Sequence, residues 1–190
     1  MEPALEAMVR ELYDKQKIRE VVTRYCRGVD RMDRALFLSA YHPDAIDDHG
    51  FVVAGPEEFW TWVNHYHSTA QSTHQHIVTN HSCELDGDIA HAETYWLFAA
   101  LDPNGQNLTI GGGRYIDRME KRGGEWRIAA RKCVPDWGGQ PVATQISPEA
   151  RAMLAQSGTT ARDAGDCSYE RPLTIPAERI GINVDILAGA

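Results

Sequence analysis

Two histidines, His74 and His76, lie one residue apart in the segment STHQHIVTN, whose pattern is typical of a β-strand. Side chains of a strand alternate between its two faces, so both imidazoles point in the same direction. Such a pair could supply metal ligands, or a base that removes a proton beside a polar neighbour. A third possibility is that both rings are only packed side chains.

A metal site of this kind needs at least one further ligand, commonly another histidine or a carboxylate. The first glutamate after the pair is Glu84, eight residues beyond His76. His91 and Glu93 follow on the next predicted strand, but their spacing is not distinctive. The sequence therefore gives little support to a metal centre, and we expect neither a metal nor another cofactor.

A carboxylate, Asp30, stands at the end of a predicted amphipathic helix over residues 5–30. The apolar stripe of this helix recurs at steps of three and four, at Val9, Leu12, Tyr13, Val22, Tyr25, Cys26 and Val29. The C-terminal end of a helix is an unfavourable place for a negative charge. Asp30 is thus either a solvated surface residue or the partner of a nearby cation or histidine.

An arginine, Arg131, lies on the last predicted strand, in the segment EWRIAARKC. Its neighbours of the same parity include Ala129 and Cys133, which leave room for a ligand but fit a salt bridge equally well. Most of the aromatic residues are expected in the core: Tyr25, Trp60, Trp62, Tyr95, Trp96, Phe98, Tyr115 and Trp137. The glycines at 111–113 lie in a strand, which favours close packing over phosphate binding.

The order of elements predicts an α+β fold. After the first helix come a short helix that ends at Pro43, an extended piece over 50–55 and a helix that starts at Pro56. Four extended segments follow, joined by turns rich in Gly, Asn or Asp: 73–85, 89–101, 107–121 and 125–136. Helices followed by an antiparallel meander predict a curved sheet with helices on one side, forming a cone with an internal pocket.

The last part of the chain, residues 138–190, has a different character. It is rich in proline and contains one short predicted helix, with Ser147 as N-cap and Pro148 in the first turn. Its remainder is too apolar for a free disordered tail. We expect an arm that packs on the body or on a neighbouring subunit.

Composition excludes several classes of partner. A formal net charge of −8 argues against nucleic acid and anionic membranes, since both require clustered Lys and Arg. No apolar run is long enough to span a bilayer, and the N-terminal residues lack an export signal, so we expect a cytoplasmic protein. The cysteines are scattered singly, which indicates neither a disulfide framework nor a zinc ribbon.

Four segments, RGVDRMDRALFLSAYHPDA, GPEEF, HQHIVTN and GEWRIAARK, together resemble the SnoaL-like branch of the NTF2-like superfamily. The resemblance covers about residues 8–137 and is nearest to the group of scytalone dehydratase, γ-hexachlorocyclohexane dehydrochlorinase and bile acid 7α-dehydratase. It implies a cone-shaped domain over 1–137, an arm over 138–190, and a homotrimer.

By this resemblance, Asp30 orients His76, and His76 removes a proton from a substrate carbon. Arg131 would hold a leaving group or developing anion, and Tyr25 would act as an acid through its hydroxyl. The residues implied to bind substrate are Tyr115, His74, Trp96, Trp60, Thr94 and Asp47. Tyr115 is also a candidate acid.

The activity implied is a cofactor-independent lyase. It would eliminate water, halide or a small carbonyl fragment such as formaldehyde from a hydrophobic aromatic or alicyclic molecule. Three alternatives stay open: an isomerase or polyketide cyclase on the same fold, a non-catalytic β-subunit of a ring-hydroxylating dioxygenase, and a small-molecule binding module.

Overall fold

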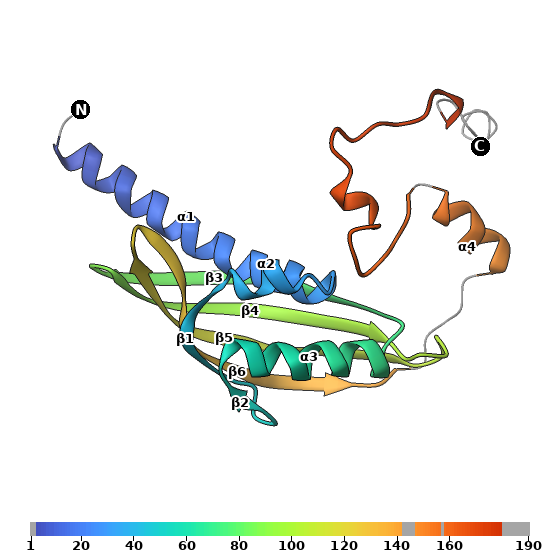
Figure 1. Cartoon of the computed structure of the whole chain (residues 1–190), viewed down its shortest axis with the longest axis horizontal. Coiled ribbons are helices and arrows are strands. Elements are labelled where there is room, and N and C mark those ends of the chain that lie inside the picture. Colours follow the sequence, from blue (N-terminus) through green and yellow to red (C-terminus); the bar gives the residue numbers. More distant parts are fainter. Residues whose placement is uncertain (1–2, 142–146, 157, 180–190) are drawn as a thin grey trace.

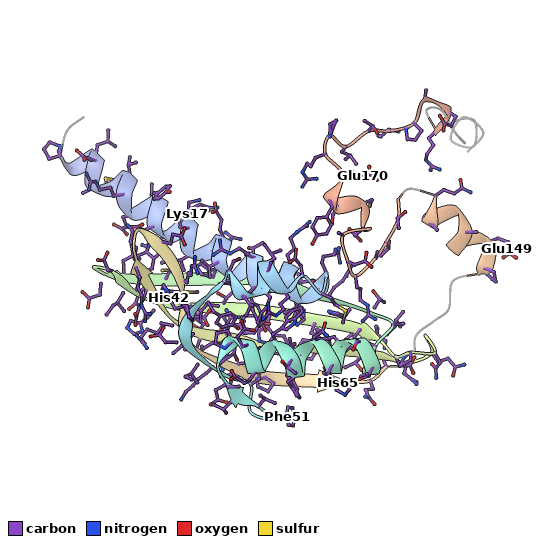
Figure 2. The ribbon with its side chains drawn as sticks, viewed as in Figure 1. Lys17, His42, Phe51, His65, Glu149 and Glu170 are labelled. Atoms are coloured by element: carbon purple, nitrogen blue, oxygen red, sulfur yellow. The ribbon has the colours of Figure 1, made fainter. Side chains whose placement is uncertain are left out.

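A computed structural model of the chain describes residues 3–141, 147–156 and 158–179. It shows one curved sheet whose inner face is covered by helices (Figure 1). Side chains crowd the layer between the helices and the sheet (Figure 2). The predicted α+β class is confirmed.

Three helices lie over the sheet. They are α1 (Pro3–Asp30), α2 (Arg34–Leu38) and α3 (Pro56–Ala70). The carboxylate of Asp33 caps α2 by accepting a hydrogen bond from the backbone N–H of Leu36 at 2.9 Å. Pro56 begins α3, with Glu57 and Glu58 in the first turn, where the helix dipole favours negative charge.

The sheet has six strands in the order β2-β1-β6-β5-β4-β3. Their bounds are β1 (Tyr41–Asp48), β2 (Val53–Ala54), β3 (Thr73–Asp86), β4 (Ile89–Leu101), β5 (Leu108–Arg122) and β6 (Glu125–Gly139). Strands β3 to β6 form the predicted antiparallel meander. Gly87 and Gly123 take positive φ in two of the tight turns, a conformation that favours glycine.

Strand β1 was not predicted, and it makes the sheet mixed. The sequence pattern placed a helix up to Pro43, whereas α2 ends at Leu38 and β1 starts at Tyr41. β1 pairs parallel to β6, with Asp47 opposite Arg131. Burial alternates from Ala45 to Asp47, as in a strand with one face toward the core. Proline is tolerated here because β1 carries only the two-residue strand β2 on its other side.

The core lies where the second half of α1 meets the sheet. Buried residues of α1 include Ile18, Val22, Tyr25 and Val29. The first half of the predicted stripe is exposed instead, at Val9, Leu12 and Tyr13. In Figure 1 the N-terminal end of α1 extends away from the sheet, in keeping with this exposure.

The C-terminal segment contains α4 (Pro148–Ala155) and two short 3₁₀ turns, Cys167–Tyr169 and Ala177–Arg179. It contacts the end of α1 through an ion pair of Arg31 with Asp166 at 3.4 Å. The guanidinium of Arg27 stacks over the ring of Tyr169. Part of the predicted arm, residues 180–190, lies outside the described residues. None of the described helices combines the length and apolar character needed to cross a bilayer.

A close contact between helices is made at Gly28 of α1. A Cβ atom at this position would lie 2.6 Å from the backbone nitrogen of Phe37 in α2, inside van der Waals contact. Glycine therefore permits the approach of α2 that carries the buried ring of Phe37 into the core.

We expect Gly28→Ala to lower the free energy of unfolding by about 1–3 kcal/mol, because the added methyl group overpacks this contact. Urea denaturation measures the change. Gly139→Ala is the control, since nothing lies within 4 Å of a Cβ there. Equal stability of the Gly28→Ala variant and the wild type would contradict the packing argument.

Candidate functional site

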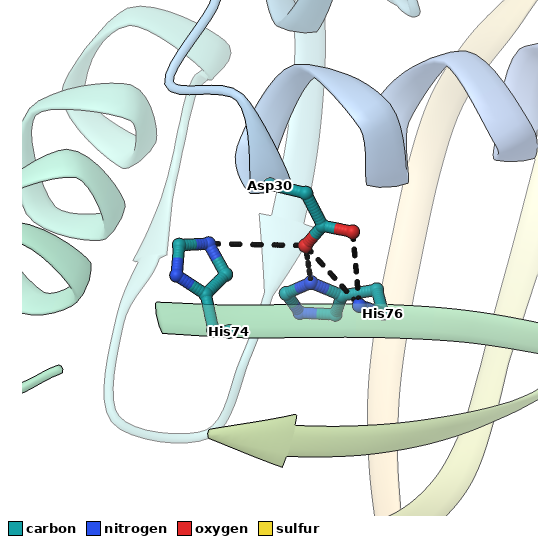
Figure 3. Close-up of side chains that lie close together, drawn as sticks. All are labelled: Asp30, His74 and His76. Atoms are coloured by element: carbon teal, nitrogen blue, oxygen red, sulfur yellow. Dashed lines mark hydrogen bonds and ion pairs between the residues drawn. The ribbon is translucent and has the colours of Figure 1, made fainter. Parts of the chain in front are cut away.

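Asp30 and His76 form a hydrogen-bonded pair between the end of α1 and β3 (Figure 3). The ring Nδ1–H of His76 donates to Oδ1 of Asp30 at 2.7 Å. The backbone N–H of His76 also reaches both carboxylate oxygens, at 3.1 and 3.0 Å. Both side chains are largely buried, with 14% of Asp30 and 10% of His76 exposed. The carboxylate fixes the tautomer of the imidazole and leaves Nε2 with a free lone pair.

His74 lies on the same face of β3, deeper in the protein. Its Nε2 is 3.2 Å from the carbonyl oxygen of Val29 and 3.8 Å from Oδ1 of Asp30. Since a carbonyl only accepts, Nε2 carries the proton. Burial lowers the pKa of His74 to about 4, and the neighbouring His76 adds to the effect. His74 is therefore a neutral support behind the carboxylate.

His67 of α3 was not singled out from the sequence, yet it stacks on His74 with ring centroids 4.1 Å apart. Its Nδ1–H donates to Oε1 of Gln71 at 2.6 Å. Burial lowers the pKa of His67 to about 3, with a further contribution from His74. No distinctive spacing marks His67, because its place depends on how α3 packs over β3.

A cavity of about 400 Å³ opens beside these histidines, which is a size suited to a small organic ligand. His76 and His67 form part of its wall, together with His49, Tyr25 and Tyr115. Most of the remaining wall is apolar, at Trp62, Val63, Tyr66, Trp96, Phe98, Ile110 and Cys133. His76, with its free Nε2, therefore lines a largely apolar cavity.

The structure corrects the role expected for Arg131. Its guanidinium is fully buried, donates two hydrogen bonds of 2.7 Å to Asp117, and is absent from the cavity wall. It lies between the rings of Tyr25 and Tyr115, 4.3 and 4.1 Å from their centroids. Burial opposes its charge, but Asp117 outweighs this and keeps the pKa of Arg131 high. Arg131 thus positions the two tyrosines and does not face a leaving group.

The other expected substrate contacts divide into two groups. Trp96 lines the cavity, and Gly113 leaves room for its ring, since a Cβ there would lie 2.5 Å from it. Trp60 and Thr94 are not on the wall. Trp60 packs on Phe37 in the core, whereas Thr94 shares a hydrogen bond of 2.8 Å with His81.

Asp47 is buried behind the wall and bonded to His49, a residue that was not predicted. Nδ1 of His49 donates to Asp47, and the hydroxyl of Tyr41 donates to the same carboxylate. Nε2 of His49 is 3.5 Å from the hydroxyl of Tyr25. The sequence signal for this pair is the spacing of two residues between Asp47 and His49, which places both side chains on one face of a strand. The signal was missed because β1 itself was not predicted.

Asp30, His74 and His76 can also be considered as metal ligands, because one donor atom from each lies within 4.8 Å of the others. The hydrogen bonds of the two histidines do not fit a metal site. Nε2 of His74 and Nδ1 of His76 both face acceptors, so both carry protons. A metal ion would require these protons and their hydrogen bonds to be lost.

The buried histidines predict acid sensitivity. The unfolded chain protonates His67 and His74 near their ordinary pKa of 6.5, whereas the folded protein keeps them neutral to about 3 and 4. The unfolded state therefore binds more protons below pH 6.5, so the free energy of unfolding falls as the pH drops from 6.5 toward 4. Each histidine contributes up to about 1.4 kcal/mol per pH unit, measurable by urea denaturation.

His67→Gln should make this decline shallower, because it removes one of the two groups. His65→Gln is the matched control, since His65 is an exposed residue of the same helix (Figure 2). A decline in the His67→Gln variant as steep as in the wild type would contradict the assignment.

Solved structures similar to this one share its fold. A hexachlorocyclohexane dehydrochlorinase from Novosphingobium barchaimii has a TM-score of 0.67 at 19% identity, over 74% of this chain and 98% of that one. A putative scytalone dehydratase from Novosphingobium aromaticivorans has a TM-score of 0.63 at 15% identity, over 73% and 94%. A protein of unknown function from Mycobacterium tuberculosis has 0.59 at 25% identity, over 72% and 77%.

No curated protein matches the chain significantly. The sequence profile of the SnoaL-like domain, however, matches residues 10–132. This region spans more than half of the 190 residues and contains most of α1, all of α2 and α3, and nearly all of the sheet. The chain therefore belongs to the SnoaL-like domain family.

Proposed function

We propose that the protein is a cofactor-independent lyase in which His76 removes a proton from a substrate carbon. The observation that carries the proposal is the Asp30–His76 pair at the wall of an apolar cavity. Neutral imidazole is the side chain best suited to accept a proton near neutral pH. Asp30 orients the ring and stabilises the imidazolium that forms.

The surroundings of the pair favour this chemistry. An apolar chamber excludes water and thereby strengthens the interaction of the carboxylate with the charged ring. His74 and His67 stay neutral, so they do not compete with His76 for the charge of Asp30. The reaction class is elimination of water, halide or a small carbonyl fragment.

The wall of the cavity indicates the class of substrate. Its aromatic side chains include Trp62, Tyr66, Trp96, Phe98 and Tyr115, and its volume is about 400 Å³. These features favour an uncharged aromatic or alicyclic molecule of one or two rings. The dehydratase and dehydrochlorinase among the similar structures support an elimination, although their similarity extends only to the fold.

An isomerase or cyclase would use the same proton abstraction, so the products distinguish it from a lyase. A non-catalytic β-subunit or a binding module would have no need of a buried pair with a free Nε2.

We also propose that the protein assembles as a homotrimer through the outer face of the sheet. Ile77, Leu97, Tyr95 and Ile116 share this face by their register, and between 39% and 46% of each is exposed. An apolar surface of this kind is typical of an interaction site. The arm would add contacts to the body or to a neighbouring subunit.

A screen of protein stripped of metal with a chelator tests the reaction. The compounds are aromatic and alicyclic alcohols, diols, halides and β-hydroxy ketones. We expect elimination products from the wild type and a loss of at least about 100-fold in His76→Gln and in Asp30→Asn, because general base catalysis contributes about 100- to 10,000-fold.

His91→Gln is the control for this screen, since His91 is an exposed histidine on the adjacent strand β4. Circular dichroism and thermal unfolding verify that each variant is folded. Activity that disappears on chelation would support a metal site instead. Activity that persists in His76→Gln would contradict the proposal.

Leu97→Arg should convert the trimer to monomer, because it places a charge in the proposed interface. Sedimentation velocity measures the mass. His65→Arg adds the same charge on α3, away from the outer face of the sheet, and should leave the assembly intact. Deletion of residues 165–190 should weaken both assembly and activity. A monomeric wild type would exclude this assembly.

A further inference from the structure

We propose that Asp47 and His49 form a second catalytic pair, in which His49 donates a proton to an oxygen leaving group. This inference rests on the proposed function, and it narrows the reaction to dehydration or the loss of another oxygen-linked group. His76 would remove the proton from carbon, and His49 would complete the departure of the oxygen.

The second pair repeats the arrangement of the first. In each pair a carboxylate binds Nδ1 of the imidazole, and the histidine belongs to the cavity wall. Asp47 is buried and also accepts from the hydroxyl of Tyr41, which holds the carboxylate in place. A carboxylate in this position stabilises a protonated His49, the state that an acid needs before it donates.

The two pairs come from strands toward opposite edges of the sheet. His49 directly follows β1, whereas His76 lies on β3. Strands β6, β5 and β4 separate β1 from β3 in the sheet. A substrate in the cavity therefore meets two imidazoles from different strands, so that one can take a proton while the other serves a leaving group on the neighbouring carbon.

A hydroxyl on the wall connects His49 to the cavity. The oxygen of Tyr25 lies 3.5 Å from Nε2 of His49. Burial raises the pKa of Tyr25 well above its ordinary value, and the nearby Asp47 adds to this. The phenol therefore remains protonated and can orient an oxygen beside His49 by hydrogen bonding.

The charge distribution favours an oxygen leaving group over a halide. A halide departs as an anion without taking a proton, and none of the described wall residues is a Lys or Arg that would hold it. Arg131 is already engaged with Asp117. A hydroxyl group, in contrast, leaves readily only when it receives a proton, and an acid in the wall supplies this.

The step balances without a co-reactant. Nε2 of His76 takes the proton from the carbon next to the carbonyl, and the electrons of that C–H bond are held in an enolate before they form the new C=C bond. The C–O bond breaks with its electron pair on oxygen, which takes the proton from Nε2 of His49 and departs as water. Transfer of a proton from His76 to solvent and from solvent to His49 restores both residues.

The test compares leaving groups on matched carbon skeletons. The probes are monocyclic and bicyclic β-hydroxy ketones, including 3-hydroxy-1-tetralone, each paired with its acetate ester. Acetate leaves with little need of a proton, so His49→Gln should lower kcat on the alcohols at least 100-fold and on the esters less than 10-fold. His76→Gln should lower both at least 100-fold. Rates are corrected for uncatalysed elimination.

Hydrogen–deuterium exchange tests the role of His76 as the base separately from the departure of the leaving group. His49→Gln should still exchange the proton next to the carbonyl with D2O, followed by NMR, whereas His76→Gln should not. Asp47→Asn should show the same selectivity for esters, because Asp47 is a positioning residue for His49. His91→Gln should behave as the wild type.

Each other outcome is decisive. Equal losses on alcohols and esters in His49→Gln, or no loss on either, would overturn the role of His49 as the acid. Turnover of the esters alone by the wild type would overturn it as well. A wild type inactive toward every probe and every compound of the screen would contradict the proposed function, and this inference with it.

Discussion

The hydrogen bonds from His76 to Asp30 are the interaction on which the rest of the site depends. A carboxylate at the end of α1 is opposed by the helix dipole and loses hydration when it is buried. The ring and backbone N–H groups of one residue offset both costs. The same contact joins the end of α1 to β3, which is one of the two edge strands of the sheet. The proposed chemistry and the packing of α1 therefore share one set of bonds.

A second constraint is the buried ion pair of Arg131 and Asp117 beneath the cavity. A charge of this kind is tolerated in the core only when it is paired and hydrogen-bonded. The guanidinium fills the space between Tyr25 and Tyr115, so both rings are held by cation–π contact. Arg131 thereby positions the two tyrosines of the cavity wall, although the arginine itself is not part of the wall.

Much of this arrangement could be predicted from local patterns. The meander over β3 to β6 was predicted because its segments are long and are separated by turn residues such as Gly87 and Gly123. The contact between Asp30 and His76 was expected from a family resemblance and from the cost of an unpaired carboxylate at a helix end. The meander follows from local patterns, whereas the Asp30–His76 contact joins residues 46 positions apart and was supplied by the resemblance.

The features that were missed depend on tertiary contacts. Strand β1 is specified by its parallel pairing with β6, which leaves no local signal, and His49 was overlooked with it. Arg131 was expected to hold a leaving group because of the family resemblance, whereas its strand position alone fitted a ligand site and a salt bridge equally well. Its partner, Asp117 on the neighbouring strand β5, could not be identified without the register of the sheet. Strand parity gives the face of a side chain, but not whether it reaches the cavity or is paired beneath it.

The most direct measurement of the central claim is the tautomer of His76, read from ¹⁵N chemical shifts at about pH 8.5, where an ordinary imidazole is neutral. We expect a proton on Nδ1 and a bare Nε2 in the wild type, with a loss of this preference in Asp30→Asn. A proton on Nε2 of His76 in the wild type would contradict the central claim, because the nitrogen assigned as the base would then have no free lone pair.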